Sequence, residues 1–187
     1  MLHDAGISVV GRRGDDPHDD WVEQVAKGAR AAIDAGVRYG AVDRERVAIM
    51  GQSHGGLMVA NLLAHTDLFR AGVAMSGGYN KTLTPFGFQR EERSYWDVPE
   101  VYHAISPFMH ADEVDEPLPL FHGEADANRG TFPIQSRRFF RALKGLGREA
   151  RLVVLPAEGH GYRARESVLH VLWETDRWLE KQLKGDR

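Results

Sequence analysis

Short apolar runs alternate with longer amphipathic stretches along the chain. Five runs rich in Val, Ile, Leu, Ala or Phe are too short for free-standing helices, and they cover residues 7–10, 47–50, 71–75, 118–121 and 152–155. We interpret them as buried strands, because continuous apolar runs are typical of strands covered on both faces. Their alternation with helical stretches predicts an α/β fold, with a mostly parallel sheet and helices on both faces.

Helical spacing of apolar residues predicts the intervening elements. Between the first two runs, apolar positions recur over residues 21–33 behind Asp19 or Asp20, either of which is a suitable N-cap. Gly36 predicts the end of this helix. Similar stripes predict further helices over residues 57–65, 134–146 and 167–183, and Gly145 and Gly147 punctuate the 134–146 stripe.

Residues 77–116 break this alternation. Pro85, Pro99 and Pro107 interrupt an aromatic-rich stretch that we interpret as a long excursion with short helices. Such excursions usually shape substrate sites. We find no internal repeat or linker that divides the chain, so one domain is expected.

The sequence VAIMGQSHGG, residues 47–56, runs from a buried strand through G-x-S-x-G into a helix pattern. This is the context of a nucleophile elbow, in which a strained turn holds the serine hydroxyl clear of the sheet. We expect side chains at Gly51 and Gly55 to collide with the neighbouring strand and helix. Ser53 is therefore the candidate nucleophile of an α/β-hydrolase.

A serine hydroxyl needs a base within hydrogen-bond reach and an acid that orients the base. Asp126 follows a predicted strand through the short turn HGEAD, and His160 follows the next strand between two glycines. The order Ser, Asp, His matches that of α/β-hydrolases, and strand carboxyl ends are where such sheets build sites. The rival acids are Asp112, Asp115 and Glu124. His122, at the end of a buried strand, is assigned a structural role.

Attack on a carbonyl also creates an oxyanion that needs hydrogen-bond donors. In this fold one donor is the backbone N–H after the nucleophile, which here belongs to His54. The other donor comes from a loop after an earlier strand, and we find no such loop in the sequence.

Composition narrows the classes of partner. The 187 residues carry a formal charge of -3, which gives no bulk attraction to nucleic acid or anionic membranes. The absence of cysteine excludes disulfides and thiolate nucleophiles. The histidine spacing suggests no metal site, and the proposed chemistry needs no cofactor. No secretion-signal pattern is visible at the N-terminus, so a cytoplasmic location is expected.

From Gly51 onward the chain closely resembles the prolyl oligopeptidase family, and specifically its glutamyl endopeptidase branch. The segments that carry the resemblance are GQSHGG (51–56), NLLAH (61–65), YNKTLTPFGFQ (79–89), SPFM (106–109), GHGY (159–162) and HVLWETDRW (170–178), with weaker matches at 14–16 and 22–24. The resemblance implies a serine peptidase that acts on peptides through Ser53, Asp126 and His160.

Members of this family combine a β-propeller with a C-terminal hydrolase domain. The resemblance implies that residues 1–187 are a partial catalytic domain without the propeller, and that residues 7–10 correspond to its fourth strand. In such sheets the third strand lies between the fourth and fifth, so its loss leaves a slot beside residues 47–50. We therefore expect either a fragment or a strand at 7–10 that moves into this slot.

Cleavage after glutamate, which the branch implies, requires a cationic partner for the substrate carboxylate. Lys81, Arg90, Arg93 and Arg129 lie near the site segments, and Tyr79 is a further candidate for substrate contact. Two alternatives stay open at this point. One is a small carboxylesterase with the same triad, and the other is a non-catalytic remnant that lacks a complete oxyanion hole.

Overall fold

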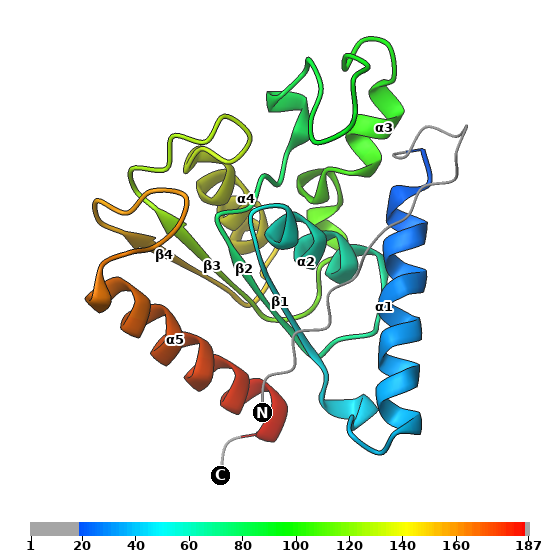
Figure 1. Cartoon of the computed structure of the whole chain (residues 1–187), viewed down its shortest axis with the longest axis vertical. Coiled ribbons are helices and arrows are strands. Elements are labelled where there is room, and N and C mark those ends of the chain that lie inside the picture. The colour runs from blue at the N-terminus through cyan, green and yellow to red at the C-terminus, as the bar shows by residue number, and fades with distance from the viewer. Residues whose placement is uncertain (1–18, 186–187) are drawn as a thin grey trace.

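A parallel sheet forms the centre of the computed structural model, which describes residues 19–185 (Figure 1). Its strands, in spatial as well as chain order, are β1 (Ala48–Gln52), β2 (Ala71–Met75), β3 (Leu118–Gly123) and β4 (Ala150–Leu155). All three pairings are parallel. Four of the predicted strands are thus confirmed, whereas the strand predicted at 7–10 lies outside the described residues.

Each face of the sheet has its own hydrophobic core, because successive side chains of a strand point to opposite faces. Ala74 and Leu120 belong to the larger core, which is completed by α1 (Trp21–Arg38), α2 (His54–His65) and α4 (Ile134–Gly145). Val73 and Phe121, one residue away, pack instead in a smaller core with Val171. Val171 belongs to α5 (Arg165–Lys184), so helices cover both faces as predicted. Within residues 19–185 no helix is long and apolar enough to cross a membrane.

The first helix begins behind Asp20 as predicted, but it ends later than expected. It continues past Gly36 to Arg38. A side chain at Gly36 would have its Cβ 2.5 Å from Val42 Cγ2, so this glycine admits the returning chain, while Gly40 takes the left-handed conformation with φ +69°. Asp20 is the N-cap residue, but its carboxylate accepts no hydrogen bond from the N–H groups of the first turn.

The long excursion contains the short helices that the prolines predicted. They are η2 (Lys81–Leu83), α3 (Pro99–Ala104) and η3 (Pro107–Glu113), and a separate turn, η1 (Arg44–Arg46), precedes β1. Pro99 and Pro107 stand at helix starts, where a missing N–H costs no hydrogen bond. Figure 1 shows this excursion projecting beyond the sheet. Its base is fixed to η3 by the Phe108 N–H, which donates to the Tyr79 carbonyl at 3.0 Å.

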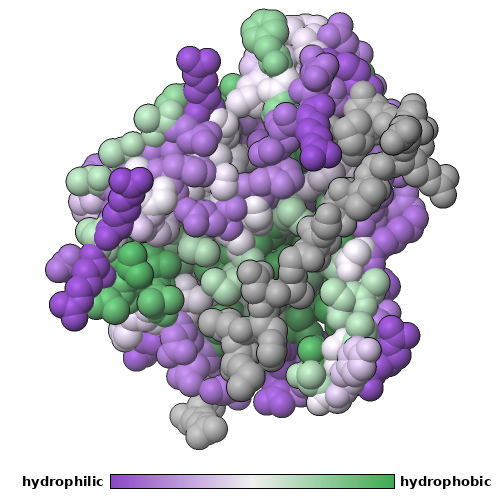
Figure 2. All heavy atoms as spheres, viewed as in Figure 1, coloured by the Kyte–Doolittle hydropathy of each residue, from purple (hydrophilic) through white to green (hydrophobic). Residues whose placement is uncertain are grey.

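Two apolar or unpaired surfaces are left uncovered by the described residues. Strand β1 pairs with β2 on one side and with no described strand on the other. On α5, large apolar side chains are 37–57% exposed, and they are Val168, Leu169, Leu172 and Trp173. Figure 2 shows a hydrophobic patch over this helix.

Candidate functional site

Ser53 occupies a strained position between β1 and α2. Its φ of 59° and ψ of -117° are unfavourable for a residue with a side chain, and such strain typically costs about 1–3 kcal/mol. The Ser53 N–H donates to the Met75 carbonyl at 2.8 Å, which anchors the turn to β2. The hydroxyl is thereby aimed away from the sheet, as the nucleophile elbow predicts.

The glycines around Ser53 have different roles from those expected. A Cβ at Gly51 would lie 2.5 Å from the Gly55 carbonyl, so the predicted crowding at Gly51 is confirmed. At Gly55 the prediction is wrong, because no described atom lies within 4 Å of a Cβ built there. The crowded helix position is Gly56, whose Cβ would lie 2.9 Å from the Met75 carbonyl oxygen.

Asp126 lies in a tight turn directly beyond β3. Its N–H donates to the Gly123 carbonyl at 3.2 Å, and its carboxylate is buried. Oδ1 accepts the Asn128 N–H at 2.9 Å, and Oδ2 accepts the Thr131 hydroxyl at 3.1 Å. The turn therefore holds both carboxylate oxygens in place independently of His160.

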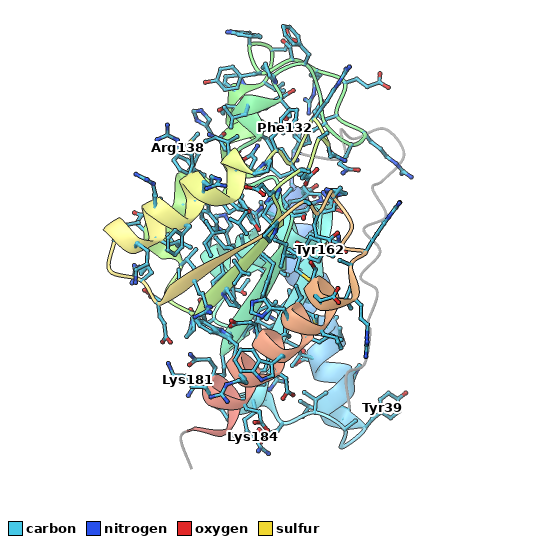
Figure 3. All side chains as sticks on the ribbon, turned by 90° about the vertical axis from the view of Figure 1, so that its left-hand side faces the viewer. Tyr39, Phe132, Arg138, Tyr162, Lys181 and Lys184 are labelled. Atoms are coloured by element: carbon cyan, nitrogen blue, oxygen red, sulfur yellow. The ribbon has the colours of Figure 1, made fainter. Side chains whose placement is uncertain are left out.

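The loop after β4 carries His160 against this turn. A Cβ at Gly123 would lie 2.1 Å from the Gly159 carbonyl oxygen, so only glycine permits the approach. The Ala125 N–H donates to the Glu158 carbonyl at 2.8 Å, and the Gln52 side chain donates to the His160 carbonyl at 2.8 Å. A further bond of 3.0 Å joins Ser76 Oγ to the Tyr162 hydroxyl, and Figure 3 shows Tyr162 on this loop, between α5 and the segments at the end of the sheet.

These turns bring the three predicted side chains into one hydrogen-bonded line. His160 Nε2 lies 2.8 Å from Ser53 Oγ, and His160 Nδ1 lies 2.9 Å from Asp126 Oδ2. A carboxylate can only accept, so Nδ1 carries the proton and Nε2 is left to accept the serine proton. Burial alone would raise the pKa of Asp126, but hydrogen bonds from His160, Asn128 and Thr131 hold it below its ordinary value. Asp126 is therefore anionic.

His122 is a fourth member of this network. It is fully buried, with Nε2 3.0 Å from Asp126 Oδ2 and Nδ1 2.6 Å from Ser136 Oγ. Burial lowers the pKa of His122, against the opposing effect of Asp126. The structural role assigned from the sequence did not include contact with the candidate acid. The signal that could have indicated it is the four-residue spacing within HGEAD.

The rival acids do not lie beside His160. Asp115 and Asp112 lie in the segment that precedes β3. The Asp115 carboxylate forms an ion pair with Arg148, and the Asp112 backbone carbonyl accepts a hydrogen bond from the same arginine. Glu124 is exposed. Asp126 is the acidic side chain that contacts both histidines of the site, His160 and His122.

A pocket of about 250 Å³ opens beside Ser53. Its walls come from the excursion and from the turn after Asp126, and the lining residues are Ser53, His54, Gly78, Lys81, Thr84, Gly87, Phe88, Gln89, Asn128, Arg129, Gly130 and Thr131. His54 begins α2, so its N–H lies at a helix N-terminus next to the candidate nucleophile. The pocket is therefore continuous with the hydrogen-bonded line.

Lys81 is the unusual residue of this pocket. Only 4% of it is exposed, and its Nζ lies 5.4 Å from the centroid of the Phe88 ring. Burial lowers the pKa of Lys81 to about 8. No described carboxylate forms an ion pair with it, although burying a charge without a partner is costly.

The remaining candidates for substrate contact separate clearly. Arg129 lines the pocket and is exposed, whereas Arg90 is exposed but not among the lining residues. The prediction that Tyr79 contacts the substrate is wrong, because Tyr79 is fully buried and stacks on Phe139 with ring centroids 4.7 Å apart. Arg93 is also outside the pocket.

Arg93 neutralises a buried carboxylate instead. Its guanidinium donates to both oxygens of Glu91, at 2.9 and 2.8 Å, and to Asp19 at 2.9 Å. Because the Glu91 side chain has no exposed surface, it requires this partner. No group of three or more His, Asp or Glu side chains suited to a metal ion is present within the described range.

Comparison with known proteins finds relatives that are peptidases by name. The chain is 54% identical over 182 residues to a probable chloroplastic glutamyl endopeptidase of Arabidopsis thaliana and 52% identical to its counterpart in Oryza sativa. These matches cover 97% of the chain but 19% of each relative. Among solved structures, a puromycin-hydrolyzing peptidase of Mycobacterium tuberculosis superposes with a TM-score of 0.76 at 26% identity, over 89% of the chain and 26% of that protein.

A family model confirms the relationship over nearly the whole sequence. The model of the prolyl oligopeptidase family matches residues 14–186. Together with the parallel sheet and the solved relatives, this match confirms the predicted α/β-hydrolase fold. The chain belongs to the prolyl oligopeptidase family.

Proposed function

We propose that this chain is the catalytic segment of a serine peptidase. The observation that carries the proposal is the position of His160, which lies within hydrogen-bond distance of both Ser53 and Asp126. Ser53 Oγ attacks the scissile carbonyl while His160 Nε2 takes its proton, and Asp126 stabilises the resulting imidazolium. The imidazolium then donates that proton to the leaving amine, and water hydrolyses the acyl-enzyme by the same route.

Charge that develops on the substrate oxygen also needs stabilisation. The His54 N–H is the proposed donor, as expected from the sequence, because it lies in the first turn of α2 directly after Ser53. The partial positive charge of the helix N-terminus acts in the same direction. Two separate properties of one turn, the strained serine and the position of the His54 N–H at a helix N-terminus, thus serve the same step.

We further propose that the pocket selects an acidic side chain on the substrate. Lys81 is a buried cation that no carboxylate within residues 19–185 pairs with, and Arg129 adds a second positive charge at the pocket wall. A carboxylate bound between them would compensate the buried charge. The names of the two plant relatives, probable glutamyl endopeptidases, support the same preference.

A fluorophosphonate probe and matched peptides test the proposal. The natural protein should be labelled at Ser53 and should cleave a glutamyl peptide, and Ser53→Ala should remove both activities. Lys81→Met should reduce cleavage of the glutamyl peptide by about tenfold or more relative to its glutaminyl analogue. The wild-type preference should weaken between pH 7 and 9, since Lys81 loses its charge near pH 8.

Lys144→Met is the matched control, because Lys144 is an exposed residue of α4 outside the pocket. It should leave the preference unchanged. Hydrolysis of short esters without cleavage of glutamyl peptides would favour a carboxylesterase. Folded protein that is not labelled at Ser53 would refute catalysis by this chain.

The chain is also proposed to be part of a larger catalytic domain. It spans about a fifth of the length of its plant relatives. The edge of β1 that no described strand covers and the exposed apolar side chains of α5 support this proposal, since both surfaces normally lie inside a protein.

A further inference from the structure

We propose that His122 is a positioning residue of the triad, which holds the Asp126 carboxylate and limits how strongly it attracts the proton of His160. The proposal rests on the proposed function. It assigns His122 a role in the reaction beyond filling the core.

Three groups donate to one carboxylate oxygen. His160 Nδ1, His122 Nε2 and Thr131 Oγ1 lie 2.9, 3.0 and 3.1 Å from Asp126 Oδ2. Two imidazole rings therefore share the same acceptor. His122 comes from β3, the strand that leads into the Asp126 turn, so the rigid centre of the sheet carries this second ring.

The proton positions in this network are fixed by its acceptors. Because Asp126 is anionic, His122 must donate through Nε2–H. A neutral imidazole then has a lone pair on Nδ1, and Ser136 Oγ, 2.6 Å away, must donate its hydroxyl proton to it. Ser136 belongs to α4. A continuous hydrogen-bonded path thus joins α4 to Ser53.

The charged and titratable groups around the path leave His122 neutral. Burial and the neighbouring His160 disfavour the protonated form of His122, whereas Asp126 favours it. Tyr162 faces Asp126 from the loop after β4, and Tyr79 lies beside Ser136 from the segment after β2. Burial raises the pKa of both tyrosines, so neither adds a charge near neutral pH.

Sharing the oxygen has a chemical consequence. A donor on Oδ2 spreads the carboxylate charge, so less of it is available to stabilise the His160 imidazolium. Loss of His122 would strengthen that stabilisation and leave the carboxylate less well oriented. Both effects are specific to the triad, and a core residue without contact to Asp126 would produce neither.

The test compares His122→Leu, His122→Gln and Ser136→Ala in the natural protein. Active sites are counted with a fluorophosphonate, and kcat and kcat/KM are measured from pH 5 to 9. In His122→Leu we expect kcat per active site to fall about 10–100-fold, with little change in KM. In the pH profile of kcat/KM, the acid limb should move to higher pH by about half a unit to one unit.

His122→Gln retains a donor and should recover most of the loss. Ser136→Ala removes only the support of His122, so it should show a fall of about three- to tenfold and a smaller shift in the same direction. Ser136→Ala therefore decides the question if His122→Leu does not fold.

Asn61→Leu is the control for core damage. Its amide donates to the carbonyls of Leu57 and Ile105 in the larger core and does not contact Asp126. It should lower the melting temperature without moving the acid limb. The proposal is overturned if kcat per active site and the acid limb stay at wild-type values in His122→Leu, or in Ser136→Ala where His122→Leu does not fold. Failure of the wild type to be labelled would instead reject the proposed function.

Discussion

Ser53 and Lys81 are both held in unfavourable states by their surroundings. Ser53 has a positive φ, and Lys81 is a buried cation with no ion-pair partner in the part of the chain that the structure describes. Proteins retain such features at functional sites, where the rest of the fold offsets their cost. These two residues face the same pocket, which links the strain to the proposed reaction.

Replacing Lys81 with Met should stabilise the protein at neutral pH. The folded-state pKa of about 8 lies below the ordinary 10.5, so the unfolded chain binds the proton more tightly. The resulting deficit is fully present below pH 8 and disappears as the pH rises from 8 to 10.5. We expect Lys81→Met to raise the free energy of unfolding by about 1–3 kcal/mol at pH 7.

Urea unfolding at pH 7 and pH 10 measures this effect. The gain from Lys81→Met should shrink at pH 10, where wild-type Lys81 is neutral in the folded state. An equal gain at both pH values would show that packing, rather than the buried charge, determines the difference.

Three candidate residues could be located from sequence because each follows an apolar run that is clearly a strand. Carboxyl ends of parallel strands share one edge of the sheet, so Ser53, Asp126 and His160 had to be neighbours. Tyr79 and Arg93 could not be assigned in this way. Both belong to the irregular excursion, where no periodicity distinguishes a buried side chain from one that faces a pocket.

At the scale of elements, close backbone contacts at the strand ends determine the site. The turn after β3 and the loop after β4 touch at Gly123, where the Cβ of any other residue would lie 2.4 Å from the Glu158 carbonyl oxygen. Backbone atoms on both sides cannot move independently. The distance between Asp126 and His160 therefore depends on a residue that takes part in no chemistry.

Gly123→Ala should separate these two segments. We expect kcat/KM to fall by about 100-fold, because a displacement of about 1 Å in a catalytic group has an effect of this size. The free energy of unfolding should fall by about 1–3 kcal/mol, as for other overpacked sites. Kinetics and urea unfolding of the same preparation give both values.

Gly145→Ala provides the comparison, since nothing lies within 4 Å of a Cβ built at this end of α4. It should keep wild-type kinetics. Wild-type kinetics in Gly123→Ala as well would show that the loop can yield without disturbing the triad.

The strands and long helices were predictable because their apolar periodicity is strong. Their glycines were harder to interpret. Gly36 was expected to end a helix, yet it accommodates Val42, and the crowding expected at Gly55 occurs at Gly56. A glycine that permits close approach has the same appearance in a sequence as one that ends an element.

For the molecule as a whole, the exposed side of α5 predicts incomplete burial. The 187-residue chain produced alone should bind a hydrophobic dye through Leu169, Leu172 and Trp173, which are 52–57% exposed. Replacing all three with Gln should reduce dye binding several-fold. A monomer that binds no dye would contradict this prediction, and Tyr39→Gln, at an exposed isolated aromatic residue, is the control.

The spacing of the triad along the chain has a consequence for biosynthesis. Ser53 is translated 107 residues before His160, and β4 must join β3 before His160 can approach. The spatial order of the strands is also their order along the chain, from β1 to β4. A growing chain therefore carries the nucleophile turn without its base until β4 and the loop after it have been translated. The proposed peptidase would be inactive towards neighbouring nascent chains until that point of its own synthesis.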